Sequence, residues 1–258
     1  MVKKIIFSSL VLLVITTSIT FAAGERYWLR ELYPQGIYGI TYNPNTNRIY
    51  YVNYTTQVIY IASSDSFVTS YGTIPTPNND SGCVDLKYCA YDNTFWVLNK
   101  RHKAVYKINT SGTVLRSFSV SYMDYPCGLA WDNINRQIYI SDRRTSGGQT
   151  QYIYCLDTMG TVIRQMNHPY QGAWYGTRCL DYVPAQGGNP AHLLNVYTFF
   201  NSSSTLDSAG VFALNPQNCQ KINFFRYCHP SNDSSNIRGV VVDPRDGSYW
   251  ITLYQYGT

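Results

Sequence analysis

The stretch that decides the fold is Gly128–Pro169, GLAWDNINRQIYISDRRTSGGQTQYIYCLDTMGTVIRQMNHP. It holds four short apolar runs separated by residues that favour tight turns: Gly128–Trp131, Gln137–Ser141, Tyr152–Leu156 and Val162–Met166. The second and third runs, QIYIS and YIYCL, are rich in β-branched and aromatic residues with partial alternation, which is typical of strands. This stretch therefore predicts a meander of four antiparallel strands.

The same order of four runs recurs along the chain. Three further units begin at residues 39, 85 and 177, and a last one begins at Arg238 and contains only two runs. The units follow one another at intervals of roughly 40 to 60 residues, and four strands at this period are typical of a β-propeller blade. A β-sandwich also alternates its strands, but nothing in a sandwich requires a block of four to repeat.

The last unit is short, and the segment before the first unit supplies a candidate for one missing strand. Residues 26–33 (RYWLRELY) resemble an orphan outer strand, and pairing them into the last blade would cover an exposed edge. We expect residues 24–258 to form one all-β propeller of about five four-stranded blades, in which the N-terminal strand completes the last blade. An incomplete ring of six or seven blades is the alternative.

Residues 1–22 have the pattern of a secretory signal peptide. Lys3 and Lys4 precede an apolar stretch over residues 5–15, and Thr20-Phe21-Ala22 places small side chains at −3 and −1 of a cleavage site. The apolar stretch is about half of the ~20 residues that a membrane-spanning helix needs. We expect a secreted protein, extracellular, at the cell surface or in the periplasm, that meets the membrane only through this segment before cleavage.

Export sets expectations for the cysteines and the partners. Oxidation outside the cytoplasm predicts disulfides, with at least one thiol left over from an odd set of seven: Cys83, Cys89, Cys127, Cys155, Cys179, Cys219 and Cys228. No C-x-x-C occurs, which argues against a zinc or thioredoxin-type site. Removal of Lys3 and Lys4 lowers the net charge from +5 to +3. The remaining Lys and Arg are scattered and form no basic stripe, so we expect no nucleic-acid partner.

Carboxylates are scarce. The only two glutamates, Glu25 and Glu31, precede the first unit, whereas glycosidases usually need two carboxylates in distinct environments. Some aspartates are expected to stabilise turns: Asp92, Asp132, Asp243 and Asp246. Others lie near strand ends and are better candidates for chemistry: Asp85, Asp142, Asp157 and Asp181. No phosphate loop or G-x-S-x-G elbow occurs, so we predict no catalytic and no metal-binding residue, although Ca²⁺ held by Asp and backbone oxygens is chemically compatible.

Residues 39–61, GITYNPNTNRIYYVNYTTQVIYI, resemble the YVTN/NHL class of bacterial propeller repeats. The first strand ends in Asn43-Pro44, an Asn-Arg turn follows, and Gly128-Leu-Ala-Trp-Asp and Gly239-Val-Val-Val-Asp-Pro repeat the opening. The resemblance implies a secreted or surface-exposed propeller, commonly an interaction scaffold and sometimes an enzyme. Streptogramin-lyase-like propellers use His with Glu, and gluconolactonase-like propellers use Glu on a divalent ion; no Glu lies within a blade of this chain.

Aromatic residues give the strongest clue to function, since Tyr occurs 25 times in 258 residues. Aromatics on strands suit packing between blades. The loops at 122–125 and 168–175 precede first strands and open at one end of a propeller around its axis. Aromatic rings beside Asp, Arg and Asn suit sugar rings or peptide segments, so we expect a ligand-binding surface there: Tyr122, Tyr125, Tyr170, Trp174, Tyr175 and Arg178.

Three functions fit these observations. The first is an exported, non-catalytic propeller that binds a protein or glycan partner through the loops at one end. The second is an extracellular polysaccharide hydrolase or lyase that uses aspartates and Ca²⁺, which a cluster of polar titratable groups at the axial mouth would favour. The third is a structural subunit of a cell-surface layer or filament, which bare strand edges at residues 26–33 and 248–258 would favour.

Overall fold

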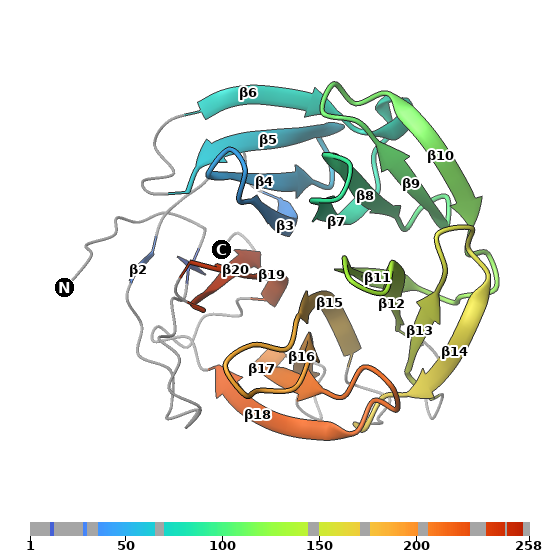
Figure 1. Cartoon of the computed structure of the whole chain (residues 1–258), viewed down its shortest axis with the longest axis vertical. Helices are drawn as coiled ribbons and strands as arrows, with labels where there is room; N and C mark the ends of the chain where they lie inside the picture. The colour runs from blue at the N-terminus through green and yellow to red at the C-terminus, as the bar shows by residue number, and fades with distance from the viewer. Residues whose placement is uncertain are drawn as a thin grey trace.

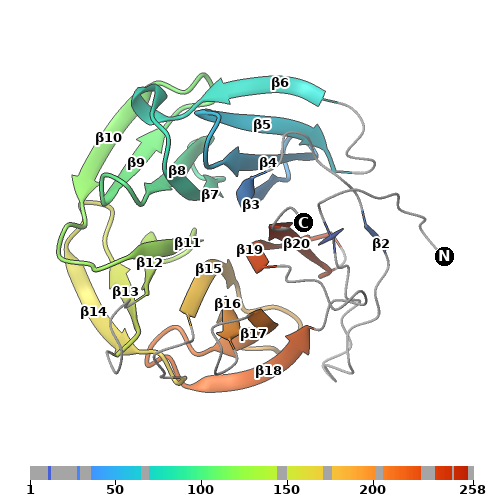
Figure 2. The same ribbon diagram turned by 180° about the vertical axis from the view of Figure 1, so that it is seen from behind.

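The computed structural model of the chain describes residues 11–12, 28–29, 36–64, 70–143, 150–170, 176–200, 206–227, 236–245 and 247–254. Sheets of antiparallel strands stand around a central axis, with the first strand of each sheet innermost (Figures 1 and 2). The predicted β-propeller is confirmed. In the described part of the chain, no helix is long and apolar enough to cross a membrane.

Four sheets are complete four-stranded blades, each in sequence order from the axis outward. The first blade comprises β3 (Ile37–Asn43), β4 (Arg48–Asn53), β5 (Val58–Ser63) and β6 (Ser70–Pro75). The second comprises β7 (Cys83–Cys89), β8 (Thr94–Asn99), β9 (Ala104–Ile108) and β10 (Val114–Ser119). The third comprises β11 (Pro126–Asp132), β12 (Gln137–Asp142), β13 (Tyr152–Leu156) and β14 (Val162–Asn167). The fourth comprises β15 (Gly176–Val183), β16 (His192–Phe200), β17 (Leu206–Leu214) and β18 (Lys221–Tyr227).

A fifth, shorter sheet closes the ring. It pairs β19 (Asn236–Val242) with β20 (Tyr249–Tyr254), and β19 lies between β15 of the fourth blade and β3 of the first. A separate two-stranded sheet pairs β1 (Val11–Leu12) with β2 (Trp28–Leu29), and β1 lies beside β20. The described part of the expected strand at 26–33 is β2, which pairs with β1 and not with β19 or β20, so the prediction that it completes the last blade is wrong for these residues. Its partner β1 comes from the segment predicted to be a signal peptide.

Side chains of Asn and Asp stabilise the turn between the first and second strand. In three sheets, a side-chain oxygen accepts a hydrogen bond of 2.9 Å from the backbone N–H two residues further along the chain. The accepting residues are Asn43, Asp132 and Asp243. The hairpin ends on a residue with positive φ, such as Asn47, Arg136 or Gly247, a conformation that Asn and Gly adopt most easily. The predicted structural role of Asp132 and Asp243 is confirmed; Asp246 lies outside the described residues.

Aromatic side chains fill the spaces between neighbouring blades, as predicted for aromatics on strands. Tyr50 of the first blade meets Phe95 of the second with ring centroids 4.7 Å apart. Trp96 of the second blade meets Trp131 of the third at 5.9 Å. Flat rings cover much apolar area at little cost in side-chain entropy, and Trp96 is only 1% exposed. The repeated aromatic in the second strand therefore holds blades together.

No disulfide joins the six described cysteines, which are all buried and free; Cys228 lies outside the described residues. The disulfides expected from export are therefore not formed by these six residues. Burial raises the pKa of the Cys83 and Cys219 thiols to about 12. Such thiols stay protonated at neutral pH and are poor nucleophiles.

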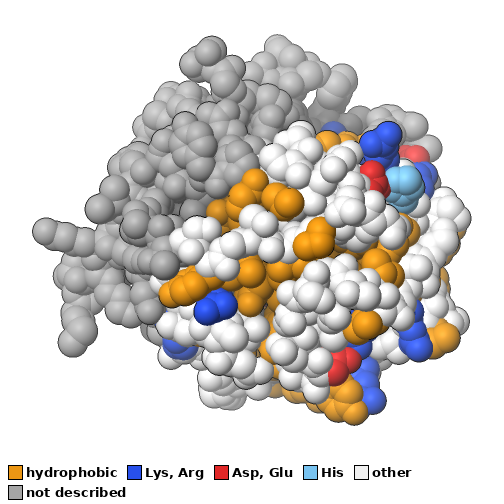
Figure 3. Space-filling model, turned by 90° about the horizontal axis from the view of Figure 1, so that it is seen from above, with side chains coloured by type: hydrophobic (Ala, Val, Ile, Leu, Met, Phe, Trp, Pro, Cys, Tyr) orange, Lys and Arg blue, Asp and Glu red, His pale blue; other side chains and the backbone are white. Residues whose placement is uncertain are grey.

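The rim of the propeller is made of the fourth strands, which face solvent. Leu115 of β10 is 55% exposed and Ile163 of β14 is 43% exposed. The described surface at one edge of the disc mixes apolar and neutral side chains, with only scattered charges (Figure 3).

Candidate functional site

The innermost strands approach each other so closely that glycine is required at the contacts. A Cβ atom on Gly39 of β3 would lie 2.4 Å from the Cα of Asp85 on β7, and one on Gly128 of β11 would lie 2.7 Å from the Cα of Cys179 on β15. A Cβ on Gly239 of β19 would lie 2.5 Å from a backbone carbonyl oxygen of β3. Neighbouring blades therefore meet backbone to backbone around the axis.

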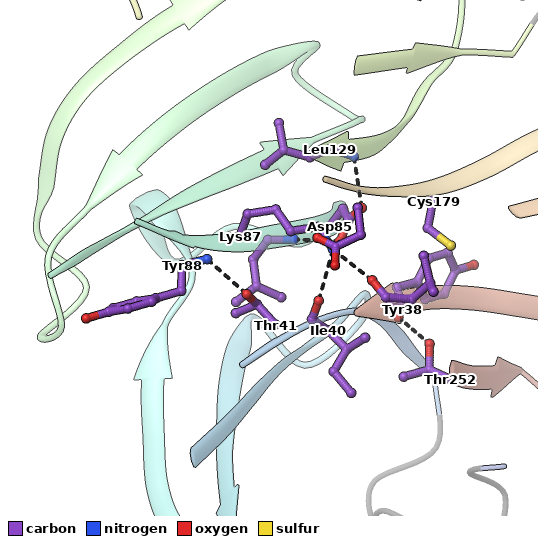
Figure 4. A network of polar contacts seen from close by, with 12 residues as sticks. Tyr38, Ile40, Thr41, Asp85, Lys87, Tyr88, Leu129, Cys179 and Thr252 are labelled. Carbon is purple, nitrogen blue, oxygen red and sulfur yellow. Dashed lines mark hydrogen bonds and ion pairs between the residues drawn. The ribbon is translucent and has the colours of Figure 1, made fainter. Parts of the chain in front are cut away.

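A buried lysine sits at this closed centre (Figure 4). The Lys87 Nζ donates to the carbonyl oxygens of Ile40 at 3.1 Å and Val240 at 3.0 Å. It also lies 3.7 Å from Oδ1 of Asp85 and 3.5 Å from Oδ1 of Asp181. The Lys87 side chain is 3% exposed, so one ammonium group links β3, β7, β15 and β19.

The two aspartates extend this network to backbone N–H groups of neighbouring strands. Asp85 Oδ2 accepts from the N–H of Leu129 on β11 at 2.8 Å, and Asp181 Oδ2 accepts from the N–H of Val242 on β19 at 3.0 Å. With Lys87, they connect the innermost strands of all five sheets. We call Asp85, Lys87 and Asp181 the hub.

Burial and charge oppose each other in the hub. Burial raises the pKa of Asp85 to about 7 although Lys87 and two N–H donors lower it, and burial likewise raises the pKa of Asp181. For Lys87, burial lowers the pKa, but Asp85 and Asp181 together outweigh it and hold the pKa above its ordinary value. The lysine is therefore charged at neutral pH. Because the hub is buried, these groups bind strands together rather than a ligand.

A second arrangement lies at the end of the propeller where first strands begin and second strands end. The Lys100 Nζ lies 3.8 Å from the ring centroid of Tyr125, hydrogen-bonds its hydroxyl, and lies 5.4 Å from the ring centroid of Tyr54. The Arg143 guanidinium lies on the ring of Tyr125 as well, 5.7 Å from its centroid. Two cations from different blades thus share one tyrosine.

The arrangement continues toward the fifth sheet. The rings of Tyr54 and Tyr38 stack with centroids 5.0 Å apart and an interplanar angle of 26°, and the Arg238 guanidinium lies 4.9 Å from the Tyr38 centroid. Tyr38 is fixed in turn because Thr252 Oγ1 donates to its carbonyl oxygen at 2.6 Å. We call this series the tyrosine–cation row: Arg238, Tyr38, Tyr54, Lys100, Tyr125 and Arg143.

Two cations of the row lack the ion pairs that some other cations of the described chain form. Lys107 and Arg245 each form an ion pair with an aspartate. Within the described residues, neither Lys100 nor Arg143 has an ion-pair partner, and the Arg143 Nε is buried without a hydrogen-bond acceptor. At Lys100 and Arg143 the row therefore carries positive charge that no carboxylate among the described residues pairs with.

The structure separates the residues predicted to line a binding surface. Tyr125 belongs to the row, and Arg178 lies buried on β15 with its Nε donating to Thr198 Oγ1 at 3.0 Å. Tyr122 packs edge-on against Tyr154 of β13, with centroids 5.5 Å apart. Tyr170 packs against Tyr197 of β16 at 5.6 Å. Two members lie outside the described residues: Trp174 and Tyr175.

Sequence reasoning missed the remaining members of the row, although three of them follow an Asn or Asp at the same position of successive repeats. The residue directly after the second strand follows an Asn or Asp in three successive blades: Asn53-Tyr54, Asn99-Lys100 and Asp142-Arg143. These polar side chains fix the loops at the mouth: Asn99 Oδ1 accepts from the N–H of His102 at 3.0 Å, and Asp142 Oδ1 accepts from the N–H of Tyr125 at 2.7 Å. The same position in the first three blades therefore delivers one side chain to the row.

Tyr170 belongs to a buried aromatic cluster around His168. The imidazole stacks on Tyr197 with centroids 4.7 Å apart, and Nδ1 accepts from the N–H of Tyr170 at 3.1 Å. Burial lowers the pKa of His168 from 6.5 to about 4. The neutral ring is thus an integral part of the contact between β14 and β16.

We expect His168 to make the fold sensitive to acid. Its folded-state pKa lies below the unfolded value, so its contribution to stability is full above pH 6.5 and is lost as the pH falls toward 4. His168→Phe keeps an aromatic ring but has no titratable group. Between pH 7 and pH 5, the free energy of unfolding of the wild type should fall by about 2 kcal/mol more than that of His168→Phe. Urea unfolding at both pH values measures this difference. His192→Gln is the control, and equal pH slopes for wild type and His168→Phe would contradict the assignment.

No protein-family model matches the chain, and no curated protein matches it. Solved structures do match: a hydrazine synthase of Kuenenia stuttgartiensis, at 13% identity and a TM-score of 0.54, over 92% of this chain and 59% of that one. A chain of a nidogen/laminin complex matches at 13% identity and a TM-score of 0.53, over 95% of this chain and 99% of that one. A streptogramin B lyase matches at 13% identity and a TM-score of 0.49, over 96% and 88%. The chain spans about three fifths of the hydrazine synthase chain. At 13% identity, the similarity shows that this chain has a β-propeller fold but does not assign the chain to the YVTN/NHL class.

Proposed function

We propose that this protein is an exported, non-catalytic binding module that holds an extracellular partner at the end of the propeller that carries the tyrosine–cation row. The observation that carries the proposal is the row itself. Lys100 and Arg143 come from different blades, lie on the same tyrosine, and have no carboxylate partner among the described residues. The pattern of residues 1–22 supports export.

The row is pre-formed. Each of its tyrosine rings contacts a cation or a second ring. The Tyr38 carbonyl oxygen accepts a hydrogen bond from Thr252 Oγ1, and the Tyr125 N–H donates one to Asp142 Oδ1. The hub fixes β3 and β19, which carry Tyr38 and Arg238, and β11, which directly follows Tyr125. A rigid surface loses little side-chain and loop entropy on binding, so more of the contact energy is expressed as affinity.

The contacts of the aspartates support a binding role over the hydrolase or lyase alternative. Asp85 and Asp181 are buried in the hub. Asp142 accepts from loop N–H groups, and Asp157 accepts from the N–H of Met159 at 2.8 Å within a tight turn. The four carboxylates that the sequence offered for catalysis thus have structural partners. Among the described residues, no group of three or more His, Cys, Asp or Glu side chains is arranged to hold a metal ion.

A binding screen with matched tyrosine variants tests the proposal. The exported protein is applied to an array of extracellular glycans and matrix proteins, and bound ligands are re-examined for cleavage. Tyr54→Ala and Tyr125→Ala should weaken the strongest interaction at least about tenfold, because each removes a ring that positions Lys100.

The control variant is Tyr91→Ala. Tyr91 is 65% exposed and also contacts a cation, Arg136, but it lies in a first-to-second-strand turn at the opposite end of the propeller. Its loss should leave binding unchanged. The proposal is wrong if the row variants bind as the wild type does, or if the bound ligand is cleaved.

A further inference from the structure

The tyrosine rings of the row contact cations or each other, so they are not arranged as a stacking platform for a ligand. Lys100 lies on Tyr125 and near Tyr54, Arg238 lies on Tyr38, and Tyr38 and Tyr54 stack on each other. An aromatic platform for a neutral sugar needs a ring face in contact with solvent. Here the rings hold positive charges in place, through the attraction between a cation and an aromatic ring.

The positive charges are spread around the mouth of the propeller. Arg238 comes from β19 of the fifth sheet, Lys100 from the loop after β8 of the second blade, and Arg143 from the end of β12 in the third. Arg143 also reaches the fourth blade, because a Cβ on Gly176 of β15 would lie 2.6 Å from its Nε. Charges spread over several blades suit a ligand that carries several anionic groups, rather than a single small ion.

The chemistry of the row indicates which kind of polyanion fits. Lys and Arg bind carboxylate and sulfate oxygens through charge-assisted hydrogen bonds, and tyrosine hydroxyls can hydrogen-bond sugar hydroxyls. The row consists only of Tyr, Lys and Arg, so it offers no aliphatic pocket. Peptide partners usually depend on side chains anchored in such pockets.

We infer that the row binds an acidic polysaccharide, a chain of sugars that carries carboxylates on successive units. The inference rests on the proposed binding function and specifies its ligand. Lys100 and Arg143 make the principal contacts because their charges have no ion-pair partner within the described chain. Arg238 extends the contact toward the fifth sheet.

Titration calorimetry with matched polymers tests the ligand class. The probes are polygalacturonate, its methyl ester, which keeps the sugar backbone but removes the charges, and polyglutamate as an acidic peptide. The wild type should bind polygalacturonate and not the ester. Affinity should fall about tenfold between 50 and 300 mM salt, because salt screens and competes for the contacts.

Single-charge variants locate the site. Lys100→Gln and Arg143→Gln should each weaken binding of polygalacturonate about tenfold or more. Arg136→Gln should not, although it removes an arginine that lies 4.1 Å from the centroid of Tyr91 at the opposite end. Thermal melting shows whether each variant is folded, and a variant that fails to fold is replaced by Lys100→Met or Arg143→Met, which also removes the charge and should likewise weaken binding.

Each contrary outcome is distinct. Equal affinity for the ester and the acid would overturn the inference but leave the proposed binding function intact. Tighter binding of polyglutamate at the same residues would assign the row to an acidic protein and overturn the polysaccharide class. Equal losses in Arg136→Gln and Arg143→Gln would remove the row as the site and overturn both proposals. Failure of the wild type to bind polygalacturonate would also overturn the inference.

Discussion

Replacing Lys87 by Met is expected to lower the free energy of unfolding by about 3–5 kcal/mol. The substitution keeps the length and apolar stem of the side chain but removes the charge that lies near Asp85 and Asp181. It also removes the donor to the carbonyl oxygens of Ile40 and Val240. Two buried carboxylates would then face each other without a counter-ion. Urea unfolding at pH 7 measures the loss.

The expected loss depends on pH in a specific direction. Burial already raises the pKa of Asp85 to about 7 while Lys87 opposes the shift, so removing the lysine raises that pKa further. A group with a raised folded-state pKa stabilises the fold when it is protonated, and this stability is lost as the pH rises. Lys87→Met should therefore be closest to the wild type near pH 4 and furthest from it near pH 8.

Two comparisons separate lost charge from lost packing. Lys103→Met removes a part-buried lysine whose Nζ donates to the carbonyl oxygen of Met123 at 2.8 Å without a carboxylate partner, and should cost less than about 1 kcal/mol. Adding Asp85→Asn and Asp181→Asn to Lys87→Met should recover part of the stability, because it removes the unpaired charges. Equal losses for Lys87→Met and Lys103→Met would show that the hub charges do not hold the blades together.

The strands were predictable because their signals are local. The apolar runs in the third blade correspond closely to strands: Tyr152–Leu156 is β13 to the residue, and Gln137–Ser141 is β12 without its last residue. Turn residues and alternation act over a few neighbours, so the sequence displays them directly. The repetition of four such strands then predicted the propeller, and solved structures with the same fold agree.

The hub was not predictable as a network because its partners are distant in sequence. Lys87 lies in the run DLKYC of β7, where a lysine on a strand would ordinarily face solvent. Its acceptors Ile40 and Val240 are 47 and 153 residues away. Only closure of the ring brings them together. The sequence did single out Asp85 and Asp181, but as candidates for chemistry rather than as links between strands.

Of the residues that the sequence predicted to line a binding surface, only Tyr125 belongs to the tyrosine–cation row. Loops before first strands all open at one end, and this rule selected Tyr125 as well as Tyr122 and Tyr170. Distance from the axis decides what each residue does: Tyr125 lies beside the innermost strands, whereas Tyr122 packs against the third strand of its blade. Nothing local in the sequence encodes that distance.

Replacing Gly39 by Ala is expected to cost about 3 kcal/mol of folding free energy, a large effect for one added methyl group. The new Cβ would lie 2.4 Å from both the Cα and Oδ1 of Asp85 and 3.0 Å from the backbone nitrogen of Leu86. The atoms in its way are largely backbone of β7, which cannot rotate aside as a flexible side chain can. Strand β3 would have to move away from β7, which would also lengthen the contacts of Lys87.

Gly72→Ala is the matched control for this prediction. Gly72 has a φ of +103°, where an L-residue is strained, but a Cβ there would meet nothing within 4 Å. If backbone strain alone mattered, Gly72→Ala would lower the free energy of unfolding more than Gly39→Ala, by about 1–2 kcal/mol. If contact between blades decides, Gly39→Ala lowers it more. Urea unfolding of the two variants decides between these. Because Tyr38 precedes Gly39 and belongs to the tyrosine–cation row, Gly39→Ala should also weaken ligand binding, whereas Gly72→Ala should leave it unchanged. If Gly72→Ala weakened binding more than Gly39→Ala, the contact between β3 and β7 would not position the row.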